Sequence, residues 1–408
     1  MANLSNQTSS DLMKPGKYLG ISLEELESLG ATHTAREISQ QPDLWLKTWS
    51  LVNEQQKELS AFLDQVYTYE NLDVMLTGAG TSAFIGMILS APFQRNTRQR
   101  TRAVATTDLL SHPGLYFEKE TPVLLVSFAR SGNSPESIAA VDLANSFCNN
   151  AYHLVITCNQ SGKLAGIGNS AFSYVFLLPK EADDQSLAMT GSFTAMLLAG
   201  FLISGIKRIQ QLLPEVKRLA EYGNKIIADY PAKIREVTQL DFHRAVFLGS
   251  GPLQGTAKES HLKLQELTDG KVICSYDSFL GFRHGPKVVI NPSTLLVYLF
   301  SNDEYAHQYE SDLVKAINAG ERGLYSIGIF EKKEADPGVD LAIILSDDQS
   351  ERIEENFLSV CDVLPAQLLG FFKSLQLGLS PDTPSANGTI TRVVTGVNIY
   401  NFPEEVAL

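Results

Sequence analysis

The chain has 408 residues, of which 44% are hydrophobic and 19% are charged, and its formal net charge is −13. This length suits two domains of ordinary size, each with its own hydrophobic core. The acidic balance argues against a nucleic-acid-binding protein, which needs a basic face. It does not exclude a phosphorylated ligand, because backbone amides at helix N-termini bind phosphate within acidic proteins.

Composition also argues against a metal centre, a secreted protein and a membrane protein. The four cysteines (Cys148, Cys158, Cys274 and Cys361) show no CxxC motif and no zinc-ligand spacing, so we expect them to be thiols without a ligand role. The polar N-terminus lacks the apolar segment of a secretion signal. The apolar stretch 189–206 contains several Ser and Thr residues and favours a buried helix. We therefore expect a cytoplasmic protein.

The first half of the chain alternates apolar strands with helices. A helical pattern covers 34–69, with Pro42 separating two helices. Strands are predicted at 72–77, 123–128, 153–157 and 174–178, with a weaker one at 103–107. A long helical region, 187–230, follows.

The same pattern then begins again, which indicates an internal duplication. Strands are predicted at 245–248, 295–300, 325–330 and 341–345. Each set opens with a strand, a GxG turn and a helix. Strands that alternate with helices predict parallel sheets covered by helices on both faces. We place an N-terminal arm at 1–45, one α/β domain at 46–212, and a second domain with a C-terminal tail at 213–408.

The loops that follow two strands of the first half are rich in glycine and hydroxyl side chains. They contain Gly80, Thr81 and Ser82 after the first strand and Arg130, Ser131, Gly132, Asn133 and Ser134 after the strand at 123–128. Glycine lets a phosphate approach the backbone, and the hydroxyl groups and the following helix stabilise its charge. Ligands of parallel sheets bind beyond the C-terminal strand ends, where these loops lie. The pattern predicts a phosphate site, with ordinary turn and cap chemistry as the alternative.

The helix that follows the second GxG turn carries three charged residues on one face. Glu259, Lys263 and Glu266 stand at positions i, i+4 and i+7. The chain leaves this helix near Gly270 and continues through a loop to His284. Two carboxylates, an ammonium group and an imidazole are suited to proton transfer on a small polar substrate. The alternative is a solvated helix face with Glu–Lys pairs.

The first GxG turn also resembles the dinucleotide-binding fingerprint, because Gly78-Ala79-Gly80 is followed by Ala83 at the expected spacing. The acidic residue that should bind the ribose about twenty residues later is absent, and Asp108 comes too late. A dinucleotide-dependent oxidoreductase is therefore disfavoured.

These motifs together resemble a known family. SFARSGNSPES and LTGAGTS resemble the phosphosugar-binding loops of the SIS (sugar isomerase) domain. LGSGPLQGTAKESHLKLQE, followed by RHGP, resembles the isomerase half of glucosamine-6-phosphate synthase. Over about residues 34–400 the chain is similar to the family of tagatose-6-phosphate ketose/aldose isomerases and galactosamine-6-phosphate deaminases. The resemblance implies two tandem SIS domains, each a parallel-sheet three-layer α/β/α sandwich.

The resemblance also implies roles for the residues that bind substrate. Thr81, Ser82, Ser131 and Ser134 would bind the phosphate, and Leu187 and Ala188 would line the sugar. Arg130 stands next to a position where the synthase has a hydroxyl and adds a charge to the loop. Arg392 is the candidate for the place of the synthase's C-terminal lysine.

The chemical roles implied by the family fall on the second half. Glu266 would be the base on the sugar carbons and His284 would open the ring, with Lys263 and Glu259 on the same wall. The implied reaction converts D-galactosamine 6-phosphate to D-tagatose 6-phosphate and ammonia, with no metal or redox cofactor. In the synthase the equivalent histidine comes from the neighbouring subunit, so we expect a homodimer or higher homo-oligomer with shared active sites.

Two alternatives to this function stay open at the level of sequence. One is a plain aldose–ketose phosphosugar isomerase, and the other is a non-catalytic phosphosugar sensor. A sensor would carry a DNA-binding domain, for which the first ~40 residues are too short. The sequence does not distinguish a galacto from a gluco substrate.

Overall fold

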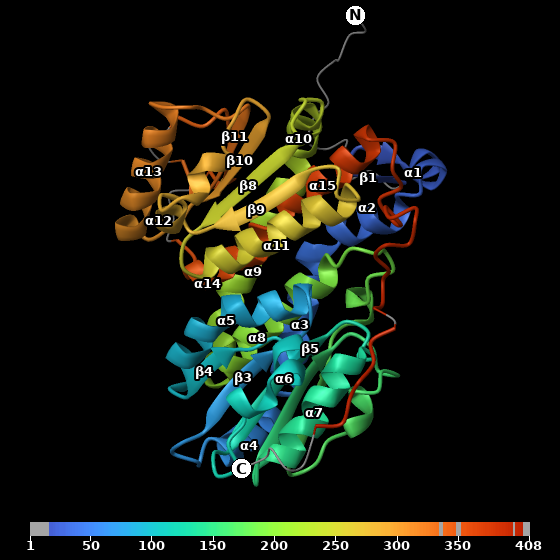
Figure 1. Ribbon diagram of the computed structural model, residues 1–408, viewed down its shortest axis with the longest axis vertical. Coiled ribbons are helices and arrows are strands. Elements are labelled where there is room, and N and C mark those ends of the chain that lie inside the picture. The colour runs from blue at the N-terminus through green and yellow to red at the C-terminus, as the bar shows by residue number, and fades with distance from the viewer. Residues whose placement is uncertain (1–15, 334–337, 348–351, 395, 403–408) are drawn as a thin grey trace, which may run out of the picture. The chain divides into compact units, whose positions relative to one another are not determined.

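The computed structural model describes residues 16–333, 338–347, 352–394 and 396–402. The chain forms two compact units that are not continuous in sequence. The first-half unit comprises Asp43–Asp183, Gly191–Lys217 and Ile390–Leu408, and the second-half unit comprises Met1–Pro42, Asp184–Thr190 and Arg218–Thr389. Within the described residues each unit contains one five-stranded parallel sheet with helices packed on it (Figure 1).

The sheet of the first-half unit has the strand order β4-β3-β5-β6-β7. Its strands are β3 (Asp73–Thr77), β4 (Arg100–Ala103), β5 (Val123–Ala129), β6 (Ala151–Thr157) and β7 (Ser173–Leu177). The two central strands β3 and β5 are buried at every residue, which explains their unbroken apolar sequences. Thr77 pairs with Ser127, so the loops after β3 and β5 leave the same edge of the sheet.

The sheet of the second-half unit has the equivalent order β9-β8-β10-β11-β12. Its strands are β8 (Arg244–Gly249), β9 (Ile273–Asp277), β10 (Thr294–Leu299), β11 (Tyr325–Lys332) and β12 (Leu341–Ser346). The prediction of two α/β domains with parallel sheets is confirmed.

Two strand predictions were wrong at the edges of the sheets. The weak strand predicted at 103–107 is instead β4, which ends at Ala103, and helix α6 begins at Thr106. Strand β9 was not predicted at all. Its sequence, ICSYD, is partly exposed along its length and so lacks the apolar run of a buried strand.

The two GxG turns have the same backbone conformation. Gly80 has φ 57° and ψ −129°, and Gly251 has φ 53° and ψ −128°, a region open in practice only to glycine. Glycine is also required at the preceding positions for close packing of helix on strand. A Cβ atom at Gly78 would lie 2.6 Å from the Cβ of Ser82, and one at Gly249 would collide with the backbone of Leu253.

The helices follow the predicted alternation with strands. In the first-half unit they are α3 (Gln41–Glu54), α4 (Gln56–Val66), α5 (Thr81–Thr97), α6 (Thr106–Ser111), α7 (Pro135–Phe147) and α8 (Gly191–Ser204). In the second-half unit they are α1 (Leu23–Leu29), α2 (Thr32–Ser39), α9 (Leu213–Asp229), α10 (Pro231–Thr238), α11 (Pro252–Leu267), α12 (Phe279–Phe282), α13 (Glu304–Asn318), α14 (Glu355–Cys361) and α15 (Leu364–Gln376). Pro42 lies in the first turn of α3, where proline is tolerated.

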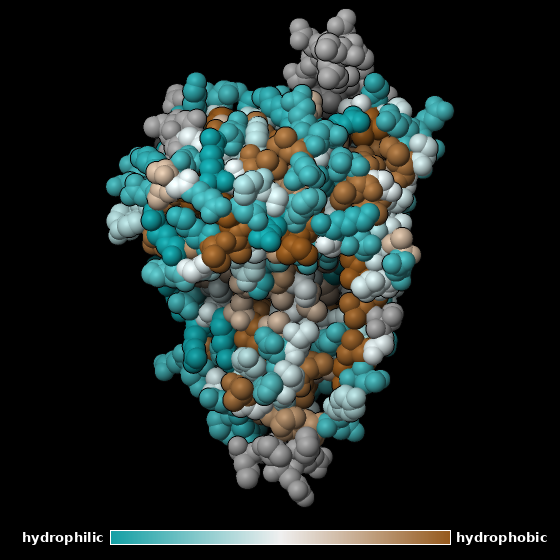
Figure 2. Space-filling view, turned by 45° about the horizontal axis from the view of Figure 1, so that its top comes forward, coloured by the Kyte–Doolittle hydropathy of each residue, from teal (hydrophilic) through white to brown (hydrophobic). Residues whose placement is uncertain are grey.

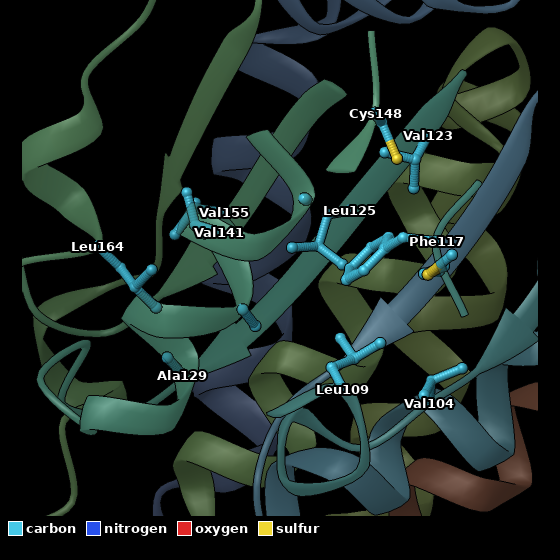
Figure 3. Close-up of a cluster of buried hydrophobic side chains, with 13 residues drawn as sticks. Val104, Leu109, Phe117, Val123, Leu125, Ala129, Val141, Cys148, Val155 and Leu164 are labelled. Atoms are coloured by element: carbon cyan, nitrogen blue, oxygen red, sulfur yellow. The ribbon is translucent and has the colours of Figure 1, made fainter. Parts of the chain in front are cut away.

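Apolar side chains between sheet and helices form the cores. Figure 3 shows one cluster of the first-half unit, in which Leu125 and Val155 from the sheet meet Val141 of α7 and Phe117. Every residue of α8 is buried. Among the described residues, the segment Glu355–Gln376 is long and apolar enough to cross a membrane, but 94% of its apolar window is buried inside the protein. Polar and apolar side chains are interspersed on the face seen in Figure 2.

Candidate functional site

The first candidate phosphate loop lies at the junction of β3 and α5. Gly80 is the N-cap of α5 and has no side chain to cap it. Thr81 and Ser82 follow in the first helical turn and are each 5% exposed. Their hydroxyl groups therefore stand at the end of the helix that carries the positive end of its dipole. This is the placement that an anion site needs.

The second candidate loop, Arg130–Ser134, follows β5 and is held by hydrogen bonds from neighbouring segments. The Oγ of Ser131 accepts the N–H of Asn133 at 3.2 Å, and its carbonyl accepts the side chain of Asn159 at 2.9 Å. Ser134 caps α7, since its Oγ accepts the N–H of Ser137 at 3.4 Å. Gly132 has φ 64°, which lets the chain turn between them. The loop is thus a fixed turn that presents N–H and O–H groups, and Ser134 has a structural role besides any ligand role.

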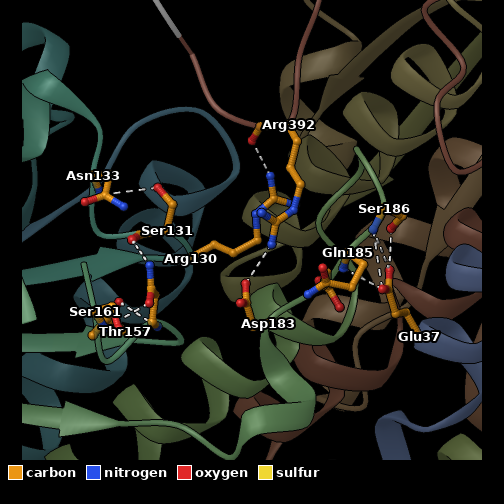
Figure 4. Close-up of polar contacts among 12 residues, drawn as sticks. Glu37, Arg130, Ser131, Asn133, Thr157, Ser161, Asp183, Gln185, Ser186 and Arg392 are labelled. Carbon is orange, nitrogen blue, oxygen red and sulfur yellow. Dashed lines mark hydrogen bonds and ion pairs between the residues drawn. The ribbon is translucent and has the colours of Figure 1, made fainter.

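Two arginines meet beside this loop, as Figure 4 shows. Arg130, which is 7% exposed, donates a hydrogen bond to the carbonyl oxygen of Arg392. Arg392 in turn pairs with the carboxylate of Asp183 at 2.7 Å. Both arginines were predicted for the substrate site, but no sequence pattern indicated that they are neighbours. This contact brings two guanidinium groups next to the loop.

The three charged residues that were predicted on one face of this helix, α11, form a buried ion cluster. The Nζ of Lys263 lies 3.2 Å from Oε1 of Glu259 and 2.7 Å from Oε2 of Glu266. The side chains of Lys263 and Glu259 are 1% and 0% exposed, whereas that of Glu266 is 23% exposed. The solvated-face alternative therefore does not describe this helix. Glu266 is the member of the cluster that a substrate can reach.

Electrostatics keep Lys263 protonated despite its burial. Burial alone would lower the pKa of its ammonium group, but the negative charges of Glu259 and Glu266 outweigh burial and raise the pKa above its ordinary value. The lysine is thus a fixed positive charge in contact with the accessible carboxylate. A carboxylate is a group that can act as a base in proton transfer.

His284 is exposed on the loop that follows β9 and α12. Helix α11 runs back along the sheet from the C-terminal end of β8, and Gln265 near its end accepts the N–H of Cys274 at the start of β9 at 3.2 Å. After α12 the chain turns back towards the start of β10, where the hydroxyl of Thr294 donates to the carbonyl oxygen of Val289 at 2.9 Å. Glu266 and His284 thus stand on different elements of the same unit.

The segment that carries Leu187 and Ala188 is an irregular, largely buried loop of the second-half unit. Ala188 is 1% exposed. Its neighbours are bound by Glu37 of α2 and by Asp382 of the C-terminal segment. Sequence reasoning missed both acids, as it missed Asp183 and Asn159, because each acts on a loop that is distant in sequence.

Comparison with known proteins places the chain among phosphosugar enzymes. Residues 69–203 match the SIS domain family. The chain is 40% identical over 94% of its length to D-galactosamine-6-phosphate deaminase AgaS of Shewanella sp. (strain ANA-3), and the match covers 95% of that protein.

Solved structures agree with this assignment of the fold. A crystal structure from Clostridium novyi NT, of a protein proposed to be a tagatose-6-phosphate ketose/aldose isomerase, superposes with a TM-score of 0.92 at 39% identity, covering 96% of this chain and 100% of that chain. The C-terminal domain of glucosamine-fructose-6-phosphate aminotransferase from Francisella tularensis superposes with a TM-score of 0.69 at 18% identity, covering 85% of this chain and 96% of that chain. That second likeness shows a common fold.

Proposed function

Because the chain belongs to the SIS-domain family of AgaS deaminases and tagatose-6-phosphate isomerases, and is thus a homologue of an enzyme, we propose that it converts D-galactosamine 6-phosphate and water to D-tagatose 6-phosphate and ammonia. The observation that carries this proposal is the near full-length identity with the Shewanella deaminase. The buried Glu–Lys–Glu cluster of α11 supports a reaction that moves protons.

The phosphate serves as a handle that positions the substrate. Thr81 and Ser82 at the start of α5, and Ser131 and Ser134 around the start of α7, supply hydroxyl groups at two helix N-termini of one sheet edge. Charge-assisted hydrogen bonds to phosphate contribute about 1.5–3 kcal/mol each. Binding energy at this remote group holds the sugar carbons in place for the chemical step.

The chemical step is a proton transfer between adjacent carbons. His284 exchanges protons with the ring oxygen and the O1 hydroxyl, which opens the ring to the free aldehyde. The carboxylate of Glu266 then removes the proton from C2, and the protonated acid returns a proton to C1. The electron pair of the C2–H bond forms the C1–C2 double bond of an enolamine, while the π pair of the C1 carbonyl moves to O1, which takes up a proton. Reprotonation at C1 then leaves an iminium group at C2, which releases an N–H proton to give the imine.

Hydrolysis completes the reaction. Water adds to the C2 imine, the C–N bond breaks, and ammonia leaves as the C2 ketone of tagatose 6-phosphate forms. Lys263 stabilises negative charge that develops on the oxygen of C1 or on Glu266, since its ammonium group contacts that carboxylate at 2.7 Å. Glu259 is fully buried and holds Lys263 from the other side.

We further propose that each working site takes Glu266 from one chain and His284 from a second copy of the chain. Within one chain Glu266 lies near the end of α11, whereas His284 lies on the loop after α12. The loop around His284 is exposed and also exposes apolar side chains, with Leu280 48% and Val288 86% exposed. An exposed apolar loop next to a reactive histidine is suited to contact with another subunit.

The test is a direct assay of substrate and product. The purified protein is incubated with galactosamine 6-phosphate or with glucosamine 6-phosphate, and ammonia and ketose are measured separately. We expect equal amounts of ammonia and ketose from the galacto compound and a lower rate from the gluco compound. Conversion of an amino-free aldose 6-phosphate to a ketose without reaction of either amino sugar would instead establish the plain isomerase, and no turnover would favour a sensor.

A further inference from the structure

A buried carboxyl group from the N-terminal region holds the loop Asp184–Thr190. Glu37 of α2 is 1% exposed. Its Oε1 accepts the backbone N–H of Gln185 at 2.6 Å and lies 3.4 Å from the N–H of Ser186, while its Oε2 accepts the hydroxyl of Ser186 (Figure 4). One side chain thus fixes two consecutive peptide groups immediately before Leu187 and Ala188.

The contacts of Ser186 connect Glu37 with the backbone of Ala188. The hydroxyl of Ser186 lies within hydrogen-bond distance of Oε2 of Glu37 and also of the carbonyl oxygen of Ala188, at 3.1 Å. A hydroxyl carries a single proton and donates it to one of the two. When Glu37 is protonated, it donates to the Ser186 oxygen, and the Ser186 proton is then available to the Ala188 carbonyl.

The environment of Glu37 makes both forms accessible. Burial, followed by the negative charge of the neighbouring Asp184, raises the pKa of Glu37 to about 7, although its hydrogen bonds with the loop oppose the rise. Asp184 is itself held in the loop, where it accepts the N–H of Thr190 at 2.8 Å. The two acids fix the two ends of the same loop.

A third acid, Asp382, fixes the helix that carries Glu37. The carboxylate of Asp382 accepts the N–H groups of His33 at 3.1 Å and Thr34 at 2.7 Å, so it caps the start of α2 from another segment of the chain. The backbone carbonyl of Asp382 also accepts the N–H of Leu187 at 3.0 Å. Helix α2, the loop and the C-terminal segment therefore form one hydrogen-bonded assembly.

We propose that Glu37 is a positioning residue for the substrate, which holds the backbone of Gln185 and Ser186 so that Leu187 and Ala188 meet the sugar in one fixed arrangement. This inference rests on the proposed function, because the sugar contact of Leu187 and Ala188 belongs to that proposal. The carboxyl group of Glu37 is hydrogen-bonded to Gln185 and Ser186 of the loop, so its effect on substrate passes through the loop.

The chemistry of the contacts predicts which replacements are tolerated. In Glu37→Gln the amide oxygen still accepts the N–H of Gln185, and the amide nitrogen donates to the Ser186 oxygen as a protonated Glu37 would. Glu37→Ala leaves the N–H of Gln185 without its acceptor and opens a cavity, so the loop loses its fixed geometry.

The first measurement is hydrogen exchange of the amides of residues 185–187 in the full-length protein, which requires no substrate. We expect exchange at these amides to be about tenfold or more faster in Glu37→Ala than in the parent, and close to the parent in Glu37→Gln, since a lost buried hydrogen bond changes local stability by about one factor of ten. Unchanged exchange in Glu37→Ala would overturn the positioning role.

The second measurement is the kinetics with galactosamine 6-phosphate. We expect Glu37→Ala to raise KM about tenfold with a smaller change in kcat, and Glu37→Gln to restore KM to within about threefold of the parent. The matched control is Glu310→Ala, which removes a fully buried carboxyl of the same unit that accepts the N–H of Ser301 at 2.9 Å. This control should lose stability but keep its KM.

The outcomes separate the inference from the function on which it rests. An equal rise of KM in Glu37→Ala and Glu310→Ala would mean general destabilisation and would overturn the inference. A parent protein without activity on amino-sugar phosphates would overturn the proposed function, and hydrogen exchange would still decide whether Glu37 positions the loop.

Discussion

The two halves of the molecule build the same strand–GxG–helix unit and give its side chains different tasks. Gly80 and Gly251 have matching backbone angles, and α5 and α11 both begin directly after them. In α5 the first two residues are Thr81 and Ser82, which carry hydroxyl groups; in α11 they are Pro252 and Leu253, which do not. The two units thus share a backbone, and at these two helical positions α5 carries hydroxyl donors whereas α11 does not.

Further along the same two helices, it is α11 rather than α5 that carries the polar cluster. Counting from the GxG turns, the positions of Glu259, Lys263 and Glu266 in α11 correspond to those of Ile88, Pro92 and Arg95 in α5. A proline in the third turn of α5 cannot join an ion cluster, and Ile88 packs in the core. In the proposed function the phosphate-binding hydroxyl groups therefore belong to the first half and the proton-transfer groups to the second.

The loops after the next strands show the same division. In the first half the loop Arg130–Ser134 combines a guanidinium group with hydroxyl and backbone donors. In the second half the cap of α13 is Asp303, and the N–H of Ser301 is already bound at 2.9 Å by the buried carboxylate of Glu310. A carboxyl group of the protein thus already occupies the backbone donor that an external anion would use.

Substitution of Glu266 is the strongest way to test this division. In Glu266→Gln the base is lost while Glu259 still pairs with Lys263 at 3.2 Å, so the protein should fold. We expect kcat to fall by roughly 10²–10⁴, and solvent deuterium to appear at C1 or C2 of product made by the parent. The equivalent change in α5, Arg95→Gln, should leave kcat unchanged. Full activity of Glu266→Gln would transfer the role of base to another group.

The phosphate loops give the next largest expected effect. Replacement of Ser131 and Ser134 by alanine removes two hydroxyl donors, so KM should rise by about 100-fold or more with a smaller change in kcat. Because Ser134 caps α7, the double variant should also lose about 1 kcal/mol of stability. The matched change in the second half, Ser301→Ala, should leave KM within about twofold. An unchanged KM in the double variant would refute the assignment of the phosphate site to this loop.

Much of this division could be predicted from sequence because it rests on local patterns. Each of these patterns lies within one strand, turn or helix and can be recognised there: the apolar strands, the GxG turns, and the spacing of Glu259, Lys263 and Glu266. The contacts that pair Arg130 with Arg392, or Glu37 with Ser186, join segments far apart in the chain and leave no local pattern. The burial of Lys263 likewise could not be predicted from the sequence, since a solvated helix face has the same spacing of charged residues.

The proposed sharing of the site between subunits can be tested by complementation. Glu266→Gln and His284→Ala proteins, each inactive alone, are mixed and allowed to exchange subunits. A mixed dimer then contains one site with both residues intact, so about a quarter of the parent activity should return after random exchange. The control replaces the His284→Ala partner with a chain that carries both substitutions, and it should restore none. No recovery with verified exchange would place the site within one chain.

The two halves should also respond in opposite directions to acid. Burial lowers the pKa of His153 in β6 to about 4, whereas burial raises the pKa of Glu310 in α13 to about 7. Because protonation of His153 is unfavourable in the folded protein, the contribution of His153 to the free energy of unfolding falls as the pH falls from about 6.5 towards 4. Glu310 acts in the reverse sense: its burial favours the protonated form, so its contribution to stability falls as the pH rises from about 4.5 to 7.

Substitutions of His153 and Glu310 test this difference through the free energy of unfolding, and their expected effects are the smallest of the predictions. Between pH 7 and pH 5, His153 should lower the free energy of unfolding by about 2 kcal/mol and Glu310 should raise it by about as much. Urea unfolding at the two pH values measures both. Relative to the parent, the free energy of unfolding of His153→Gln should change more favourably between pH 7 and pH 5, and that of Glu310→Gln should change less favourably. The exposed His243, with 67% of its side chain accessible, supplies the control His243→Gln, which should match the parent. Shifts of the same sign in the two buried-site variants would contradict the burial of one of these groups in the folded protein.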